Sequence, residues 1–169
     1  NTINYTCSFS IQYYADGTLT GATAPTDTWT ASIKIVDDSS VSASSTQAFE
    51  VGTLLALSIP GTLDYGTLAR EQSTLSTNNQ AMTITQYGND GADVEVSGGS
   101  MTCSVIGTVP FGNQQWSLTD IDYSAVGTNA LTGAAVDTNL ATGYRTIDAT
   151  ALTKVLYWNI LMPAVASGS

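Results

Sequence analysis

The first part of the chain alternates between polar and apolar side chains over residues 2–13. Successive side chains of a β-strand point to opposite faces, so this alternation predicts a half-buried strand. Its apolar face consists of Ile3, Tyr5, Cys7, Phe9 and Ile11. At about 3.3 Å per residue the strand would be roughly 40 Å long, about twice the common length. We expect it to pair either within its own domain or with a neighbouring subunit.

Shorter strands are predicted along the rest of the chain. Thr, Val, Ile and Tyr dominate the ordered runs, and none of these runs keeps the 3.6-residue period of a helix. Gly, Asn and Asp separate the runs at a spacing of about 8–12 residues, which is typical of an all-β sandwich. The predicted strands are 28–36, 47–60, 63–68, 80–87, 92–96, 101–106, 115–119 and 154–162, with a weaker pair within 120–150. The strand 154–162 is apolar on both faces, which predicts a central position in a sheet.

Six segments follow strand and turn patterns that are found together in one group of proteins. They are Thr28–Asp38, Leu63–Leu68, Met82–Asn89, Ala92–Gly98, Gly112–Thr119 and Leu156–Pro163. The first is similar to the W-x-x-x-V-x-V-x-D hairpin of immunoglobulin-like modules in exported archaeal surface proteins. The next three resemble the D-F/Y-G-T-L, V-T-I-T-N-x-G-N and D-V-x-V-x-G motifs of those modules. The resemblance implies an antiparallel β-sandwich, immunoglobulin-like or jelly-roll-like, and no particular activity.

The end of the chain differs from those modules. In them a turn of small residues leads into a final strand, whereas this sequence ends at Ser169. We therefore expect an unpaired edge on the strand 154–162 or a neighbour, and an unpaired edge attracts another strand. The edge residues would be Val155, Tyr157, Asn159 and Leu161. Donation of residues 2–13 from a second copy would fill the edge and, being head-to-tail, would propagate into a filament.

This hypothesis divides the chain into a donor strand, residues 1–14, and a β-sandwich domain, residues 15–169. The alternative is that residues 2–13 pair within their own sandwich. A second function remains open as well, namely a monomeric carbohydrate-binding or adhesive module of a cell-surface protein. The two functions differ in size in solution, because a filament subunit forms large assemblies and a binding module does not.

Composition removes several classes of function. The net charge is −10 and only four residues are Lys or Arg, which opposes binding to nucleic acid or to anionic membranes. Histidine is absent, which removes Ser–His–Asp and Cys–His catalysis and imidazole metal sites. No apolar run approaches the ~18–20 residues that span a membrane. Because the chain starts without Met, we expect an exported, extracellular protein at the cell surface. The composition and the donor-strand hypothesis together lead us to expect that it is no enzyme, uses no cofactor or metal, and pairs with identical subunits.

Two modifications are predicted. The chain has two cysteines, Cys7 and Cys103, and a lone pair in an exported protein favours an intramolecular disulfide. Two free thiols, or a bridge between copies, are the alternatives. Asn4-Tyr5-Thr6 is an N-glycosylation sequon, so Asn4 is a candidate for a glycan.

The remaining candidates each have a structural explanation. Asp93 and Glu95 share a strand face, which favours a solvated face over the carboxylate pair of a glycosidase. The turn Asn89-Asp90-Gly91 has oxygen ligands for calcium, but turn formation alone accounts for its residues. The three tryptophans could form a sugar-binding surface, although tryptophan in sandwich strands usually belongs to the core. They are Trp29, Trp116 and Trp158.

Overall fold

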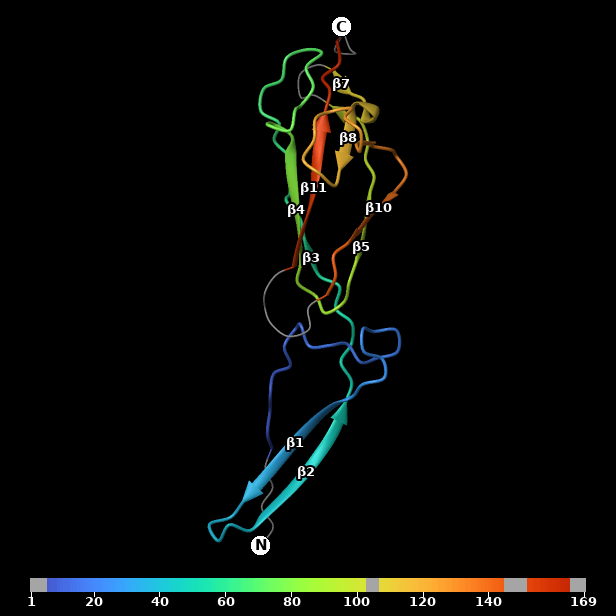
Figure 1. Cartoon of the computed structure of the whole chain (residues 1–169). Coiled ribbons are helices and arrows are strands. Elements are labelled where there is room, and N and C mark those ends of the chain that lie inside the picture. The colour runs from blue at the N-terminus through green and yellow to red at the C-terminus, as the bar shows by residue number, and fades with distance from the viewer. Residues whose placement is uncertain (1–5, 103–106, 145–151, 165–169) are drawn as a thin grey trace.

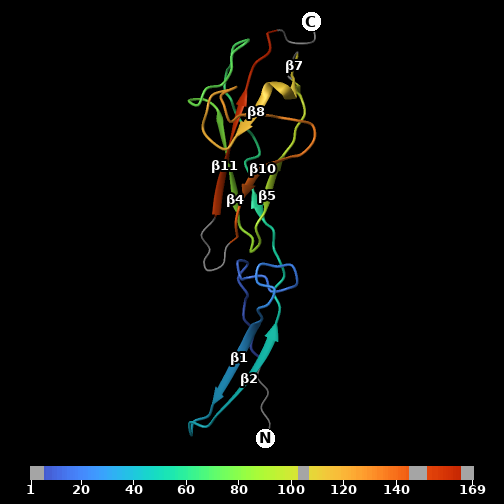
Figure 2. The ribbon, with the colours of Figure 1, turned by 45° about the vertical axis from the view of Figure 1, so that its right-hand side comes forward.

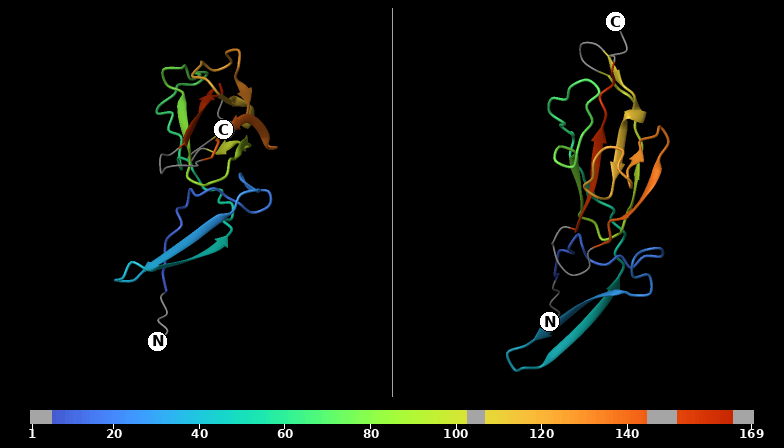
Figure 3. Two further views of the ribbon diagram at one scale, coloured as in Figure 1. Left: turned by 60° about the horizontal axis from the view of Figure 1, so that its bottom comes forward. Right: turned by 45° about the horizontal axis from the view of Figure 1, so that its top comes forward.

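The computed structural model describes residues 6–102, 107–144 and 152–164. They form an elongated molecule with two parts arranged end to end (Figure 1). We call residues 6–52 the arm and the described residues from 53 onward the head. The same arrangement is seen when the molecule is turned about the vertical axis (Figure 2) and the horizontal axis (Figure 3). The predicted division between residues 14 and 15 therefore falls inside the arm.

The described chain is nearly all β, as predicted, and its strands pair antiparallel. The strands are β1 (Trp29–Val36), β2 (Ser42–Phe49), β3 (Leu57–Ser58), β4 (Gln80–Gln86), β5 (Asp93–Val96), β6 (Met101–Thr102), β7 (Thr108–Val109), β8 (Gln114–Ser117), β9 (Asn129–Ala130), β10 (Val136–Ala141) and β11 (Leu152–Ile160). A single 3-10 turn, η1 (Phe111–Asn113), is the helical element of the described residues.

The arm is built on the hairpin β1–β2. Its register runs from the pair Trp29 and Phe49 to the pair Val36 and Ser42. The turn between the strands is organised by the Asp37 carboxylate, which accepts hydrogen bonds from the backbone N–H groups of Ser39 and Val41 at 2.9 and 2.7 Å. Alternating apolar residues and an Asp-rich turn therefore gave the correct strand and turn at this place.

The head contains a five-stranded sheet in the order β3-β4-β11-β8-β9 and two-stranded sheets β10-β5 and β6-β7. β11 is central, as its apolar faces predicted. It pairs with β4 over Leu152–Trp158 and with β8 over Tyr157–Ile160. Residues Leu152–Leu156 of β11 therefore have a ladder partner on one side only, among the residues that the structure describes.

The core of the head joins the five-stranded sheet to β5 and β10. Its buried side chains are Ile84, Val96, Trp116 and Leu156, with Met82, Val94, Leu140 and Trp158 packed around them. Burying a large apolar side chain is worth about 1.5–3 kcal/mol, so this cluster is the main source of stability of the head. The full β-sandwich remains a prediction beyond these contacts.

Two predicted strands differ from the structure. The predicted strand 47–60 is interrupted, because β2 ends at Phe49 and β3 comprises only Leu57–Ser58. The predicted strand 63–68 is absent. There the Asp64 carboxylate accepts the backbone N–H of Gly66 at 2.8 Å, and Gly66 adopts a φ of 63°, so the chain turns where a strand was expected. Within this turn, burial raises the pKa of Tyr65 to about 12, and its hydroxyl stays protonated at neutral pH.

Candidate assembly surface

The N-terminal segment, residues 6–12, is exposed and belongs to no β-strand of the described structure. Phe9 and Ile11 are 62% and 49% exposed. Over residues 6–12 the predicted strand 2–13 is therefore not confirmed, because a strand needs a hydrogen-bonded neighbour and no described strand supplies one. Ile3, Tyr5 and the candidate glycosylation site Asn4 lie outside the described residues.

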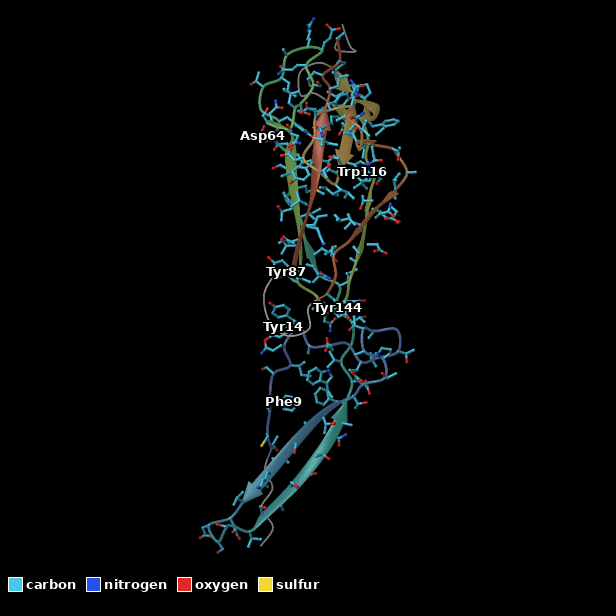
Figure 4. The ribbon with its side chains drawn as sticks, in the orientation of Figure 1. Phe9, Tyr14, Asp64, Tyr87, Trp116 and Tyr144 are labelled. Atoms are coloured by element: carbon cyan, nitrogen blue, oxygen red, sulfur yellow. The ribbon has the colours of Figure 1, made fainter. Side chains whose placement is uncertain are left out.

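An apolar groove separates the N-terminal segment from the hairpin of its own arm. Cys7, Phe9 and Ile11 line one side, and residues of β1 and β2 line the other, around a volume of about 950 Å³. The rings of Phe9 and Phe49 are in contact, with centroids 5.8 Å apart. Lys34 is the charged residue of the lining, and no carboxylate lines the groove. Figure 4 shows Phe9 on the arm, away from the head. The segment thus rests on its own hairpin without being paired to it.

A buried asparagine joins the arm to the head. The side-chain amide of Asn89 donates to the carbonyl oxygens of Ala15 and Gly52 at 2.6 and 3.1 Å, and its oxygen accepts the backbone N–H of Leu54 at 2.6 Å. Asn89 is 2% exposed. The chain approaches so closely here that a Cβ on Gly88 would lie 1.8 Å from the Leu54 oxygen. These contacts hold the chain just after the N-terminal segment, at Ala15, against the junction of the arm and the head.

The structure places the four residues predicted as the groove edge in different surroundings. Tyr157 has ladder partners on both sides, Ala81 of β4 and Ser117 of β8, and Asn159 pairs with Gln115 of β8. Leu161 forms a bridge with Ser73 and donates its N–H to the Asn113 oxygen. Val155 alone of the four lies in the half of β11 with one ladder partner. β8 lies beside the second half of β11, and this strand order is not visible in the sequence.

The predicted disulfide is absent, because Cys7 is an exposed free thiol. Cys103 lies outside the described residues, directly after β6. β6 pairs with β7 at the end of the head farthest from the arm (Figure 1). A disulfide requires Cα atoms within about 7 Å of each other, whereas Cys7 lies beside the hairpin of the arm and β6 lies at the far end of the head. A bridge between copies stays a prediction.

We expect Cys7 of the isolated subunit to react with a maleimide without prior reduction, because its thiol is exposed. Peptide mapping by mass spectrometry would assign the label to Cys7, and a Cys7→Ser variant is the control. Labelling of Cys7 only after treatment with a reductant would contradict the free thiol.

The other candidates take the positions expected of structural residues. Trp116 is 4% exposed and Trp158 packs against the same core, whereas Trp29 is 39% exposed on the arm. Asp93 and Glu95 form the exposed face of β5. Among the described residues no group of three or more His, Cys, Asp or Glu side chains could hold a metal ion.

The sequence analysis did not identify two residues that hold the N-terminal segment in place, Phe49 beside the groove and Asn89 at the junction of the arm and the head. Phe49 was predicted only as a strand residue, and Asn89 only as a turn residue. Asn89 contacts residues 74 and 35 positions away in the chain, and no local pattern distinguishes such an asparagine from one that only makes a turn. The only sequence signal for Asn89 was its place in the turn Gly88-Asn89-Asp90-Gly91.

Within the residues that the structure describes, no helix has the length and apolar character needed to cross a membrane. Comparisons with protein-family models, with curated proteins and with solved structures give no match.

Proposed function

We propose that the chain is a structural subunit of an extracellular filament or pilus, which polymerises head-to-tail by donating its N-terminal strand to the next copy. In this proposal the head is an incomplete β-sandwich that the donated strand completes. The observation that supports it is the exposed, alternating segment of residues 6–12, which lacks a strand partner in the described chain. Alternating apolar side chains are typical of a strand with one buried face, so the segment has the pattern of a strand whose partner lies elsewhere.

The energy of docking limits how the donation can work. Full burial of a large apolar side chain is worth about 1.5–3 kcal/mol, and Phe9 and Ile11 still expose about half of their surface. Docking these two would recover roughly 1 kcal/mol each. Stable polymerisation therefore requires backbone pairing along the donated strand and further apolar contacts, for which Ile3 and Tyr5 are the candidates.

Charge favours this segment as the point of contact. Each chain carries a net charge of −10, so copies repel each other over most of their surface. Residues 1–15 contain no Asp, Glu, Lys or Arg side chain. A strand without charge can enter a neighbouring subunit without taking a carboxylate out of water, which would be costly.

We expect the purified protein to form assemblies that persist at pH 3–4 and in high salt. Protonation of the carboxylates and ionic screening both weaken the repulsion between copies. Negative-stain electron microscopy and size-exclusion chromatography would measure this. Elution near 17.6 kDa under all conditions would overturn the proposal. Dissociation on acidification would instead assign the contact to carboxylate–cation pairs.

One observation favours the alternative, a monomeric carbohydrate-binding module. A hollow of about 580 Å³ on the arm is lined by two carboxylates, an aromatic ring and hydroxyl groups, which are side chains that bind sugars. The lining residues are Asp16, Thr18, Thr26, Asp27, Thr28 and Trp29. The indole N–H of Trp29 already donates to the backbone carbonyl oxygen of Asp16 at 2.9 Å, so the ring offers only a face. A monomer whose tryptophan fluorescence responds to glycans would favour this function.

A further inference from the structure

The outer strand of the five-stranded sheet carries an exposed apolar row. β3 is the last strand in the sheet order, so among the described residues it has a ladder partner, β4, on one side only. Leu55, Leu57 and Ile59 are 59%, 45% and 60% exposed. These residues are two apart in the chain, and alternate side chains of an extended segment share a face. We call them the β3 row.

The β3 row lies on the core side of the sheet. Leu57 is directly opposite Gln86 of β4, and residues opposite each other in an antiparallel pair share a face. Gln86 is completely buried, and two residues before it Ile84 belongs to the core. The pairing continues beyond β3, because the N–H of Tyr87 donates to the Ala56 oxygen at 2.8 Å. The β3 row therefore faces the same way as the core, yet no described element covers it.

The same part of the chain carries no charge. Residues 51–63 contain no Asp, Glu, Lys or Arg, and Glu50 and Asp64 lie on either side of the run. Natural edge strands are commonly protected by charged side chains, and an exposed apolar edge without them binds another strand. In a chain with a net charge of −10, an uncharged edge matches an uncharged strand.

We propose that the β3 row receives residues 6–12 of a second copy, which add a strand beside β3 and cover Leu55, Leu57 and Ile59. The inference rests on the proposed filament function and names its acceptor surface. Residues 6–12 and 55–59 both alternate, both lack charge, and each exposes an apolar face. The acceptor is thus β3, at the opposite edge from β9 and separated from β11 by β4.

The N-terminal segment does not reach the β3 row of its own chain in this structure. Asn89 contacts Ala15, Gly52 and Leu54. The end of the N-terminal segment and the start of the β3 row are therefore held near the same side chain. From there residues 6–13 run down the arm, and β3 runs into the head (Figure 1). Two segments that diverge from a shared anchor cannot pair along their length. A second copy supplies the strand without any rearrangement of the anchor.

Disulfide trapping tests the contact. Cys7 is on the apolar face of the donor, so it would lie directly opposite one position of the β3 row, at a Cα separation that a disulfide allows. In a Cys103→Ser background, single Leu55→Cys, Leu57→Cys and Ile59→Cys variants would be assembled and oxidised. Val126→Cys is the matched control, because this head residue is fully exposed and would react first in random collisions.

We expect at least one β3-row variant to give a ladder of covalent multimers on non-reducing gels, and the Val126→Cys control to remain monomeric. Filaments that form without a ladder from any of the three positions would overturn this acceptor and leave strand donation intact. A ladder from Thr153→Cys on β11 would reassign the acceptor. A faster-migrating monomer from a β3-row variant would mean that the segment pairs within its chain, which would overturn both proposals. Absence of filaments in the unmodified protein would do the same.

Discussion

Deletion of residues 1–13 is expected to give a folded monomer that no longer polymerises. The core cluster of the head contains none of these residues, so the head keeps its packing. Ala15, whose carbonyl oxygen accepts from Asn89, is retained in the truncated chain. A double substitution, Phe9→Asp with Ile11→Asp, should have the same effect, because two carboxylates would have to enter an apolar contact at a cost of several kcal/mol.

The matched control for the charged variant is Ser8→Asp with Ser10→Asp. It adds the same charges to the same segment on the polar face, and we expect it to assemble. Electron microscopy and size-exclusion chromatography report assembly, and circular dichroism reports folding. A peptide of residues 1–13 at 100 times its Kd should stabilise the truncated chain by about 2.7 kcal/mol.

Two outcomes would contradict strand donation. Normal filaments from the truncated chain would show that residues 1–13 are not the link between copies. An unfolded truncated chain that the peptide does not rescue would place the segment in its own domain.

Asn89→Ala is expected to destabilise the protein by about 3–5 kcal/mol. The substitution leaves the N–H of Leu54 and the carbonyls of Ala15 and Gly52 without their partner. Each buried group left unsatisfied costs about 1–3 kcal/mol, and partial access to water lowers the total. Chemical denaturation followed by circular dichroism would measure the free energy of unfolding.

Asn129→Ala is the control, because Asn129 is exposed and its amide makes only a 3.5 Å contact with the Gly127 oxygen. We expect a change within about 0.5 kcal/mol for this variant. Asn89→Asp is a second probe, since a carboxylate keeps the size of the side chain and cannot donate to Ala15 or Gly52. A loss at Asn89→Ala no greater than at Asn129→Ala would show that the junction is held by other contacts.

The sequence predicted those strands whose pattern is local. The run 28–36 became β1 because its alternating residues end at an Asp-rich turn that closes a hairpin. The run 80–87 became β4, and the apolar run near the end of the chain became β11. In each case the residues that specify the strand lie within it or in the adjacent turn.

The rest depends on contacts between distant segments. The second half of β11 has β8 beside it, a strand about 40 positions earlier in the chain, and no local pattern indicates this neighbour. The β3 row went unrecognised because β3 extends for only two residues, although Leu55, Leu57 and Ile59 do alternate. The alternation of residues 2–13 predicts a strand, and it does not say which strand would lie beside it.

The contact between Phe9 and Phe49 has a consequence for kinetics. A segment that rests on its own hairpin is unavailable to a neighbour for as long as the two rings touch. The affinity between free subunits is then lowered in proportion to the fraction of molecules whose segment is released. At the growing end of a filament, the N-terminal segment of a docked subunit has already left its own hairpin. The contact between Phe9 and Phe49 therefore no longer delays that subunit, although it still delays each incoming one. Free subunits would thus stay apart at low concentration and associate where their local concentration is high.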